Sequence, residues 1–214
     1  MCRILYMETK TAVDPQPLLK SFAEMACHSP EFQGHGWGCA WWAGNRWDFY
    51  WSIRPVWEDD FAAIPPTGRL MVHARSAFRD QGIAIQNNMP FVNNNTVFVF
   101  NGELHGVKIN MPGRIGAEKI FNFILRFYKG SNLKQAAQKA ISIIEARTRY
   151  IRALNFIVAD EKATVLGSHF NEQPDYFTLH LARSEKQLIV CSEPLNIYRH
   201  WQTLANKFVE EISL

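Results

Sequence analysis

The chain has 214 residues, of which 47% are hydrophobic and 20% are charged, as expected for a globular protein with its own core. Its formal net charge is only +3, and its basic residues are scattered, which argues against nucleic-acid and anionic-membrane partners. The sequence contains no apolar stretch long enough for a membrane span and no signal-peptide pattern. We therefore expect one cytoplasmic domain over residues 1–214.

Metal and cofactor sites are not predicted. The four cysteines, Cys2, Cys27, Cys39 and Cys191, have neither zinc-ligand nor CxxC spacing, so we expect reduced thiols. The seven histidines are dispersed, and no glycine-rich loop with a following lysine opens a helix. Zinc hydrolase and phosphate-loop chemistries are thus disfavoured.

The first half of the chain reads mainly as strands. Asp14 and Pro15 resemble a helix cap followed by a first-turn proline, and apolar residues at helical spacing extend this helix to residue 28. Gly44-Asn45 between two aromatic runs predicts a hairpin. The expected strands cover residues 2–7, 38–42, 47–52, 70–75 and 96–101.

The second half begins with two amphipathic helices, predicted over residues 117–129 and 133–149. Strands are expected next, and a helical stretch is expected at residues 201–209. These later strands cover residues 154–159, 162–167, 176–182 and 187–191. Consecutive helices followed by hairpins do not read as a parallel βαβ fold. The pattern predicts a layered α+β protein, which two sheets covered by helices would satisfy.

Cys2 is a candidate nucleophile because removal of Met1 would give it a free α-amine. With an ordinary pKa near about 8, that amine can take the thiol proton, which makes nucleophile and base one residue. The simpler alternative is that Cys2 merely begins a strand.

Three further residues supply complementary chemistry. Asn101 and Gly102 end a strand, and their side-chain amide and backbone N–H are the donors that an oxyanion hole needs. Arg75 ends an otherwise apolar strand, where a guanidinium requires an anion, either a bidentate substrate carboxylate or a structural partner. Gly36-Trp37-Gly38 fits a close backbone approach or a pocket wall.

Taken in order, these motifs resemble the class II glutamine amidotransferases, the cysteine branch of the N-terminal-nucleophile hydrolases, and in particular their short stand-alone members. The matching pieces span nearly the whole chain: Met1-Cys2-Arg3-Ile4, Gly36-Trp37-Gly38, His73-Ala74-Arg75, Asn88-Met89-Pro90-Phe91, Phe100-Asn101-Gly102-Glu103 and Ser192-Glu193-Pro194-Leu195.

The resemblance implies a four-layer αββα sandwich of two antiparallel sheets. It implies Cys2 as nucleophile and base, Asn101 and Gly102 as the oxyanion hole, and Arg75 as the binder of the glutamine α-carboxylate. His73, Glu103 and Trp37 are further substrate-binding candidates. The implied products are glutamate and ammonia, formed through a thioester, and a separate synthetase subunit could accept the ammonia.

One motif departs from this pattern. Relatives carry Ser-Asp-Thr-Glu after Asn-Gly, and its aspartate receives the substrate α-amine, whereas residues 114–118 here read Arg-Ile-Gly-Ala-Glu. Gly116 stands where the aspartate is expected. Either Glu103 or Glu118 replaces it, or the substrate amine is capped or absent, as in a γ-glutamyl or other amide. A non-catalytic binding protein on the same fold is the remaining alternative.

Overall fold

The computed structural model describes residues 1–130 and 132–214, which form two antiparallel sheets. The first sheet contains, in spatial order, β11 (Gln202–Thr203), β9 (His180–Arg183), β10 (Gln187–Cys191), β1 (Arg3–Val13), β4 (Thr67–Ala74), β2 (Trp37–Trp42) and β3 (Trp47–Ser52). The second contains β12 (Phe208–Ile212), β8 (Thr164–Ser168), β7 (Thr148–Ala159), β6 (Thr96–Val107) and β5 (Phe91–Asn93).

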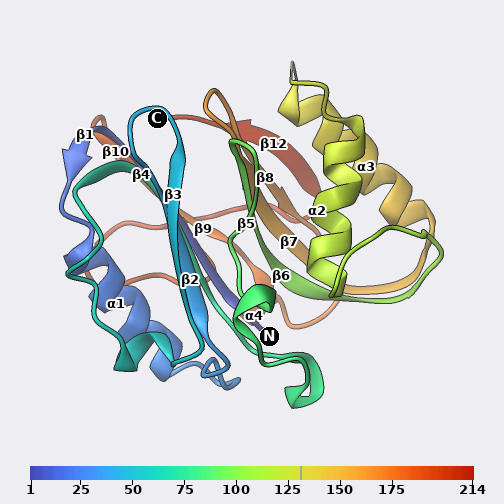
Figure 1. The fold of residues 1–214 in the computed structure, drawn as a ribbon, viewed down its shortest axis with the longest axis horizontal. Coiled ribbons are helices and arrows are strands. Elements are labelled where there is room, and N and C mark those ends of the chain that lie inside the picture. Colours follow the sequence, from blue (N-terminus) through green and yellow to red (C-terminus); the bar gives the residue numbers. More distant parts are fainter. Residues whose placement is uncertain (131) are drawn as a thin grey trace.

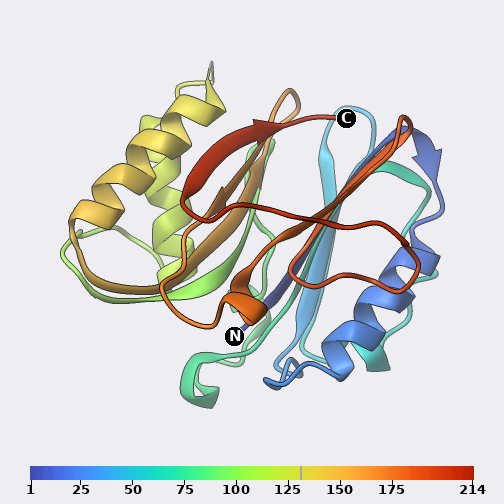
Figure 2. The ribbon, with the colours of Figure 1, turned by 180° about the vertical axis from the view of Figure 1, so that it is seen from behind.

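Helices cover the outer faces of both sheets. The α-helices are α1 (Gln16–Cys27), α2 (Gly116–Phe127), α3 (Leu133–Ala146) and α4 (Pro174–Phe177), and the 3-10 turns are η1 (Val56–Glu58), η2 (Phe78–Asp80) and η3 (Ile85–Asn87). Helix α1 lies on the first sheet, and α2 and α3 lie side by side on the second (Figure 1). The view from behind shows the same layers (Figure 2). The predicted four-layer αββα sandwich is confirmed.

Strand alternation divides the core between these layers. On β1, Ile4 and Tyr6 are buried against the second sheet, whereas Leu5 and Met7 are buried with the apolar face of α1. This is the period-2 pattern of a strand that is covered on both faces. The start of β1 is therefore fixed from two sides.

Two predicted elements differ from the structure. The helix predicted at 201–209 is wrong: β11 and β12 occupy this stretch and pair with β9 and β8. Lys207 adopts a left-handed φ of 63°, which interrupts a helix, and pairing with β8 then outweighs local helical preference. Within the strand predicted at 176–182, helix α4 comes first and β9 begins only at His180.

Two kinds of feature, a membrane-spanning helix and a metal-binding cluster, are absent from the described residues. No helix in residues 1–130 or 132–214 combines the length and hydropathy required to cross a membrane. Nor does this part of the chain contain a group of three or more His, Cys, Asp or Glu side chains arranged to hold a metal ion.

Candidate active site

Cys2 lies beside Arg75 at the ends of two paired strands. Arg3 is opposite Ala74 in the antiparallel register of β1 and β4, so the preceding Cys2 falls next to the following Arg75. The Cys2 Sγ lies 3.6 Å from the Ser76 carbonyl oxygen. The pairing of these strands thus brings together two residues that are 73 positions apart.

Arg3 anchors this end of β1. Its guanidinium is buried, pairs with the Glu193 carboxylate at 2.7 Å and donates to the Ser192 carbonyl at 3.2 Å. It also stacks over the Tyr176 ring, 4.0 Å from the centroid. The Ser192-Glu193 motif therefore fixes the residue that follows Cys2, and does not itself line the cavity.

Three side chains surround the residue that precedes Cys2. The Met1 carbonyl accepts hydrogen bonds from Gln33 Nε2 and the Tyr176 hydroxyl, each at 2.5 Å. The Met1 α-ammonium pairs with Glu31. Burial raises the pKa of Tyr176 to about 12, so its hydroxyl remains a donor at neutral pH.

The environment of Cys2 keeps its thiol protonated. Burial raises the pKa of this thiol above its ordinary value, and the positive N-terminus and Arg75 offset part of the increase. A thiol with a raised pKa is mostly protonated at pH 7, and only the thiolate is a strong nucleophile. Nucleophilic attack therefore requires a nearby group that accepts the thiol proton.

Arg75 offers an unneutralised positive charge. It is buried, and its guanidinium donates to Asn88 Oδ1 at 3.3 Å and the Gly82 carbonyl at 2.9 Å. Within the described residues it forms no ion pair with a carboxylate. Since a buried cation without an anion is costly, a ligand carboxylate would stabilise this arrangement.

The two glycines near Trp37 permit a close approach by the strand-like segment 88–90. A Cβ on Gly36, whose φ is 108°, would lie 2.3 Å from Asn88 Nδ2. A Cβ on Gly38 would lie 2.5 Å from the Met89 carbonyl oxygen. These glycines thus allow Asn88 to reach Arg75, which explains why the motifs occur together.

Asn101 carries an unpartnered amide, and its side chain does not itself line the cavity. Its side chain on β6 is fully buried, and neither its oxygen nor its nitrogen has a hydrogen-bond partner within residues 1–130 and 132–214. Such a group costs roughly 1–3 kcal/mol when left unsatisfied. The next residue, Gly102, lines the cavity itself.

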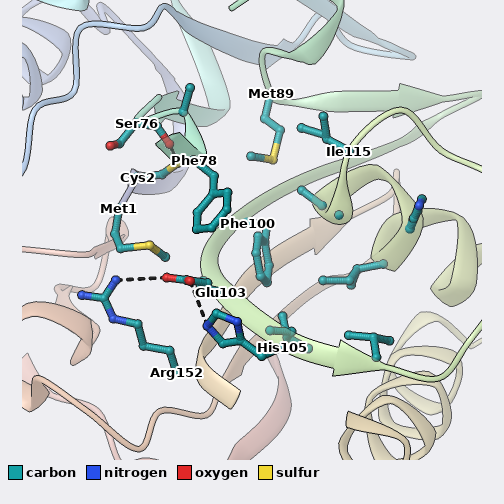
Figure 3. Close-up of a pocket in the computed structure, with 18 of the residues that line it drawn as sticks. Met1, Cys2, Ser76, Phe78, Met89, Phe100, Glu103, His105, Ile115 and Arg152 are labelled. Carbon is teal, nitrogen blue, oxygen red and sulfur yellow. Dashed lines mark hydrogen bonds and ion pairs between the residues drawn. The ribbon is translucent and has the colours of Figure 1, made fainter. Parts of the chain in front are cut away.

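The cavity has a volume of about 840 Å³, within the range of ligand-binding clefts. Cys2, Arg75, Gly102 and Glu103 all line it. Figure 3 shows Glu103 joined to Arg152 and to His105, at N–O distances of 3.1 and 2.9 Å. The Glu103 carboxylate is therefore already engaged by two basic side chains.

Two predicted substrate-binding residues do not reach this cavity. Trp37 is fully buried in the layer next to α1, and its Nε1 donates to Asp59 at 2.9 Å. His73 is also fully buried, and burial, followed by the Arg75 charge, lowers its pKa to about 3. Trp37 was predicted as part of a pocket wall and His73 as a substrate-binding candidate, but strand alternation turns Trp37 to the face next to α1.

Neither of the acids considered as replacements is free. Glu118 pairs with Arg114 at 2.6 Å and does not line the cavity. Gly116 does line it, and a Cβ at this position would meet no atom within 4 Å. The position that carries an aspartate in the resembled family is therefore open space here.

Sequence reasoning missed Glu31, Gln33, Arg152 and Tyr176. They gather around the N-terminus from a loop, from β7 and from α4. None belongs to a recognisable motif, and only the folded chain brings them together. The cluster of Arg147, Arg149 and Arg152 is equally typical of a solvated strand.

The architecture is a four-layer αββα sandwich, with two antiparallel sheets between helical layers. No protein-family model matches the chain, and no curated protein sequence matches it significantly. Solved structures do match, at identities that carry information about the fold alone.

A glutamine aminotransferase class-II domain protein from Silicibacter pomeroyi has a TM-score of 0.68 and 16% identity, over 100% of this chain and 95% of its own. A predicted glutamine amidotransferase from Pseudomonas aeruginosa has a TM-score of 0.64 and 12% identity, over 98% and 96%. The glutamine phosphoribosylpyrophosphate amidotransferase of B. subtilis has a TM-score of 0.66 and 15% identity, over 89% of this chain but 42% of its own. This chain therefore has the glutamine amidotransferase fold and spans less than half of the B. subtilis enzyme.

Proposed function

We propose that this protein is an amidohydrolase of the class II glutamine amidotransferase type, in which Cys2, freed by removal of Met1, attacks a side-chain amide. The observation that carries the proposal is the grouping of three unused functional groups. The Cys2 thiol and the unneutralised Arg75 guanidinium line one cavity together with Gly102, and the unpartnered Asn101 amide is carried by the residue next to Gly102 on β6.

The first half-reaction releases ammonia. The Cys2 α-amine takes the thiol proton, and the sulfur forms a bond to the amide carbon while the C=O electron pair moves to oxygen. The Asn101 side-chain N–H and the Gly102 backbone N–H stabilise this oxyanion. As the C=O reforms, the C–N bond breaks, and the leaving nitrogen takes the proton from the Cys2 ammonium.

The second half-reaction releases the acid. Water gives a proton to the Cys2 amine and attacks the thioester carbon, forming the same type of oxyanion. Collapse breaks the C–S bond, and the sulfur takes back the proton from the ammonium. The Arg75 guanidinium, which pairs with the substrate α-carboxylate throughout, keeps the amide carbon over the sulfur.

The N-terminal cluster supports this use of the amine. Gln33 and Tyr176 hold the Met1 carbonyl, the group immediately before the Cys2 nitrogen. Gln33 Oε1 is buried without a partner in the described part of the chain. After processing, this oxygen can accept from the Cys2 amine, which would fix the direction of its lone pair toward the thiol.

Ammonia made in such a cavity needs an acceptor. We extend the proposal to a separate synthetase subunit as the ammonia acceptor, because the B. subtilis protein of the same fold is a glutamine phosphoribosylpyrophosphate amidotransferase. Residues 1–214 would then form the single amide-hydrolysing domain.

The proposal is tested by ammonia release from L-glutamine and N-acetyl-L-glutamine. The protein must have an intact mass that shows the loss of Met1. We expect Cys2→Ala, and wild type carrying an uncleavable N-terminal extension, to lose at least roughly 10³-fold in rate. Comparable rates in all three proteins would refute Cys2 as nucleophile, and the absence of ammonia from any amide would refute hydrolysis.

A further inference from the structure

One wall of the cavity is apolar. It is formed by the end of β6, the connection to α2, and α2 itself, through Leu104, Val107, Ile109, Met111, Ile115 and Phe123. Most of these side chains are only partly covered by the protein, and Val107 is 43% exposed. Apolar surface that lines a concave site is typical of a wall that receives an apolar ligand group.

The charged groups that line the cavity do not favour a substrate ammonium group. The carboxylates that line the cavity are Glu31 and Glu103, and both pair with Arg152, at 3.3 and 3.1 Å. The N-terminus of α2 faces the cavity through Gly116 and Lys119. Its unpaired N–H groups and the lysine both carry positive charge, which repels a substrate amine.

Arg75 gives the cavity a positively charged group without an anion in the described part of the chain. Arg75 has two neutral hydrogen-bond partners and no ion pair within residues 1–130 and 132–214. A ligand that satisfies both Arg75 and the apolar wall has a carboxylate and a side-chain amide, and an apolar group in place of the free amine.

We infer that the substrate class is an N-acylated glutamine, whose acyl chain lies on the apolar wall. This inference rests on the proposed function and makes it specific. The acyl group removes the positive charge of the amine, and its chain covers Met111, Ile115 and their neighbours. The carboxylate pairs with Arg75, and the side-chain amide reaches Cys2.

Glu31 provides the competing explanation. Removal of Met1 takes away its ammonium partner and leaves only Arg152. A free glutamine could then place its amine against Glu31, and glutamine would be the better ligand. The two explanations predict opposite preferences.

The test uses N-octanoyl-L-glutamine and L-glutamine with two forms of the protein. Binding is measured by calorimetry to Cys2→Ala, which does not turn over, and ammonia release is measured with processed wild type. We expect N-octanoyl-L-glutamine to bind about tenfold more tightly or better, and to have the higher kcat/KM. Equal or tighter binding of L-glutamine, or no binding of either compound, overturns the inference.

The two proposals fail in different ways. Preferred binding of the octanoyl compound without ammonia release supports the substrate class and refutes hydrolysis. Ammonia release with a preference for L-glutamine supports hydrolysis and refutes the substrate class.

Two matched pairs of variants localise the preference. Gly116→Asp adds a carboxylate in open space, at a helix N-terminus that tolerates it, and should shift the preference toward L-glutamine by about tenfold. Asn110→Asp, the same charge change outside the cavity lining, should leave the preference unchanged.

The second pair tests the apolar wall. Met111→Gln keeps the shape of the side chain but makes it polar, so binding of the octanoyl compound should weaken about tenfold while L-glutamine binding is unchanged. Leu125→Gln, on α2 but outside the lining, is the control. Equal effects in both members of either pair would overturn the assignment of the acyl chain to this wall.

Discussion

The two walls of the cavity come from different kinds of structural element. The wall that carries Cys2, Arg75 and Gly102 comes from the ends of β1 and β4 and from β6, where strand register fixes each position. The wall that carries Met111 and Ile115 comes from a connection and the start of α2. In the function that we propose, the first wall would hold the groups for chemistry on a side-chain amide, and the second would contact the remainder of the substrate.

The residues proposed for the reaction and those proposed for substrate preference therefore lie on different elements. Sheet register resists change, because a one-residue slip would turn every side chain to the other face. A connecting segment tolerates substitution. Gly116 therefore alters the substrate preference that we propose without disturbing the nucleophile.

The largest expected effect comes from Asn101→Leu, at the residue that precedes Gly102 of the first wall. Loss of the oxyanion donor should lower kcat by about 10²–10³-fold. The free energy of unfolding should stay equal or rise by about 1 kcal/mol, because both amide atoms of Asn101 are buried without partners in the described residues. Steady-state kinetics and urea unfolding check the two parts.

Asn155→Leu is the matched control for this variant. Asn155 pairs with Asn101 across β6 and β7, but its side chain donates to the Phe177 carbonyl at 2.6 Å and accepts from Ser168 at 2.9 Å. Its replacement should destabilise the protein by about 1–3 kcal/mol. If Asn101→Leu destabilised the protein to the same extent, the proposal that the Asn101 amide serves as an oxyanion donor rather than a structural group would be contradicted.

His73, on β4, should make the stability of the protein depend on pH. Its folded pKa of about 3 lies below the ordinary value of 6.5. As the pH falls, His73 is therefore protonated in the unfolded chain before it is protonated in the folded protein. The contribution of His73 is present above pH 6.5 and is lost as the pH falls toward 3. At pH 4 the loss is about 3 kcal/mol.

The measurement is urea unfolding of wild type and His73→Gln between pH 7 and pH 4. The variant should lose less stability over this interval, and His200→Gln, at an exposed histidine, should behave as wild type. Parallel stability curves for wild type and His73→Gln would refute the buried neutral histidine.

The smallest effect is expected from Arg152→Met, which removes the positive charge that Glu31 and Glu103 share. Without Arg152, Glu31 and Glu103 lose a shared partner, so affinity for L-glutamine should rise a few-fold. The unfolding free energy should fall by less than about 1 kcal/mol, because Arg152 is partly exposed. Arg149→Met on the same strand is the control, and weaker glutamine binding by Arg152→Met would contradict this expectation.

The two walls also differ in how far the sequence predicted them. Cys2, Arg75 and Gly102 stand in short motifs whose chemistry is local, and the structure brings these residues to one cavity. Trp37 and His73 also stand in these motifs but do not line the cavity, because motif membership does not say which face of a strand a side chain occupies. The apolar wall was not predicted, since Ile109, Met111 and Ile115 have no strand or helix periodicity.

The fold itself was largely predictable. Amphipathic periodicity gave the three long helices and most of the strands, because each has an apolar face buried in a layer. The strands at residues 202–203 and 208–212 were missed. Their pairing partners, β9 and β8, lie far away in the sequence, so local propensity carries no signal of that pairing.

The central claim is that Cys2 forms a covalent intermediate, and peptide mass mapping of acid-quenched turnover tests it most directly. Protein that lacks Met1 is mixed with L-glutamine or N-octanoyl-L-glutamine, quenched, and digested. We predict an adduct equal to substrate minus ammonia on the peptide that begins with Cys2. Turnover without this adduct, an adduct on Cys27, Cys39 or Cys191, or full activity in protein that retains Met1 would contradict the account.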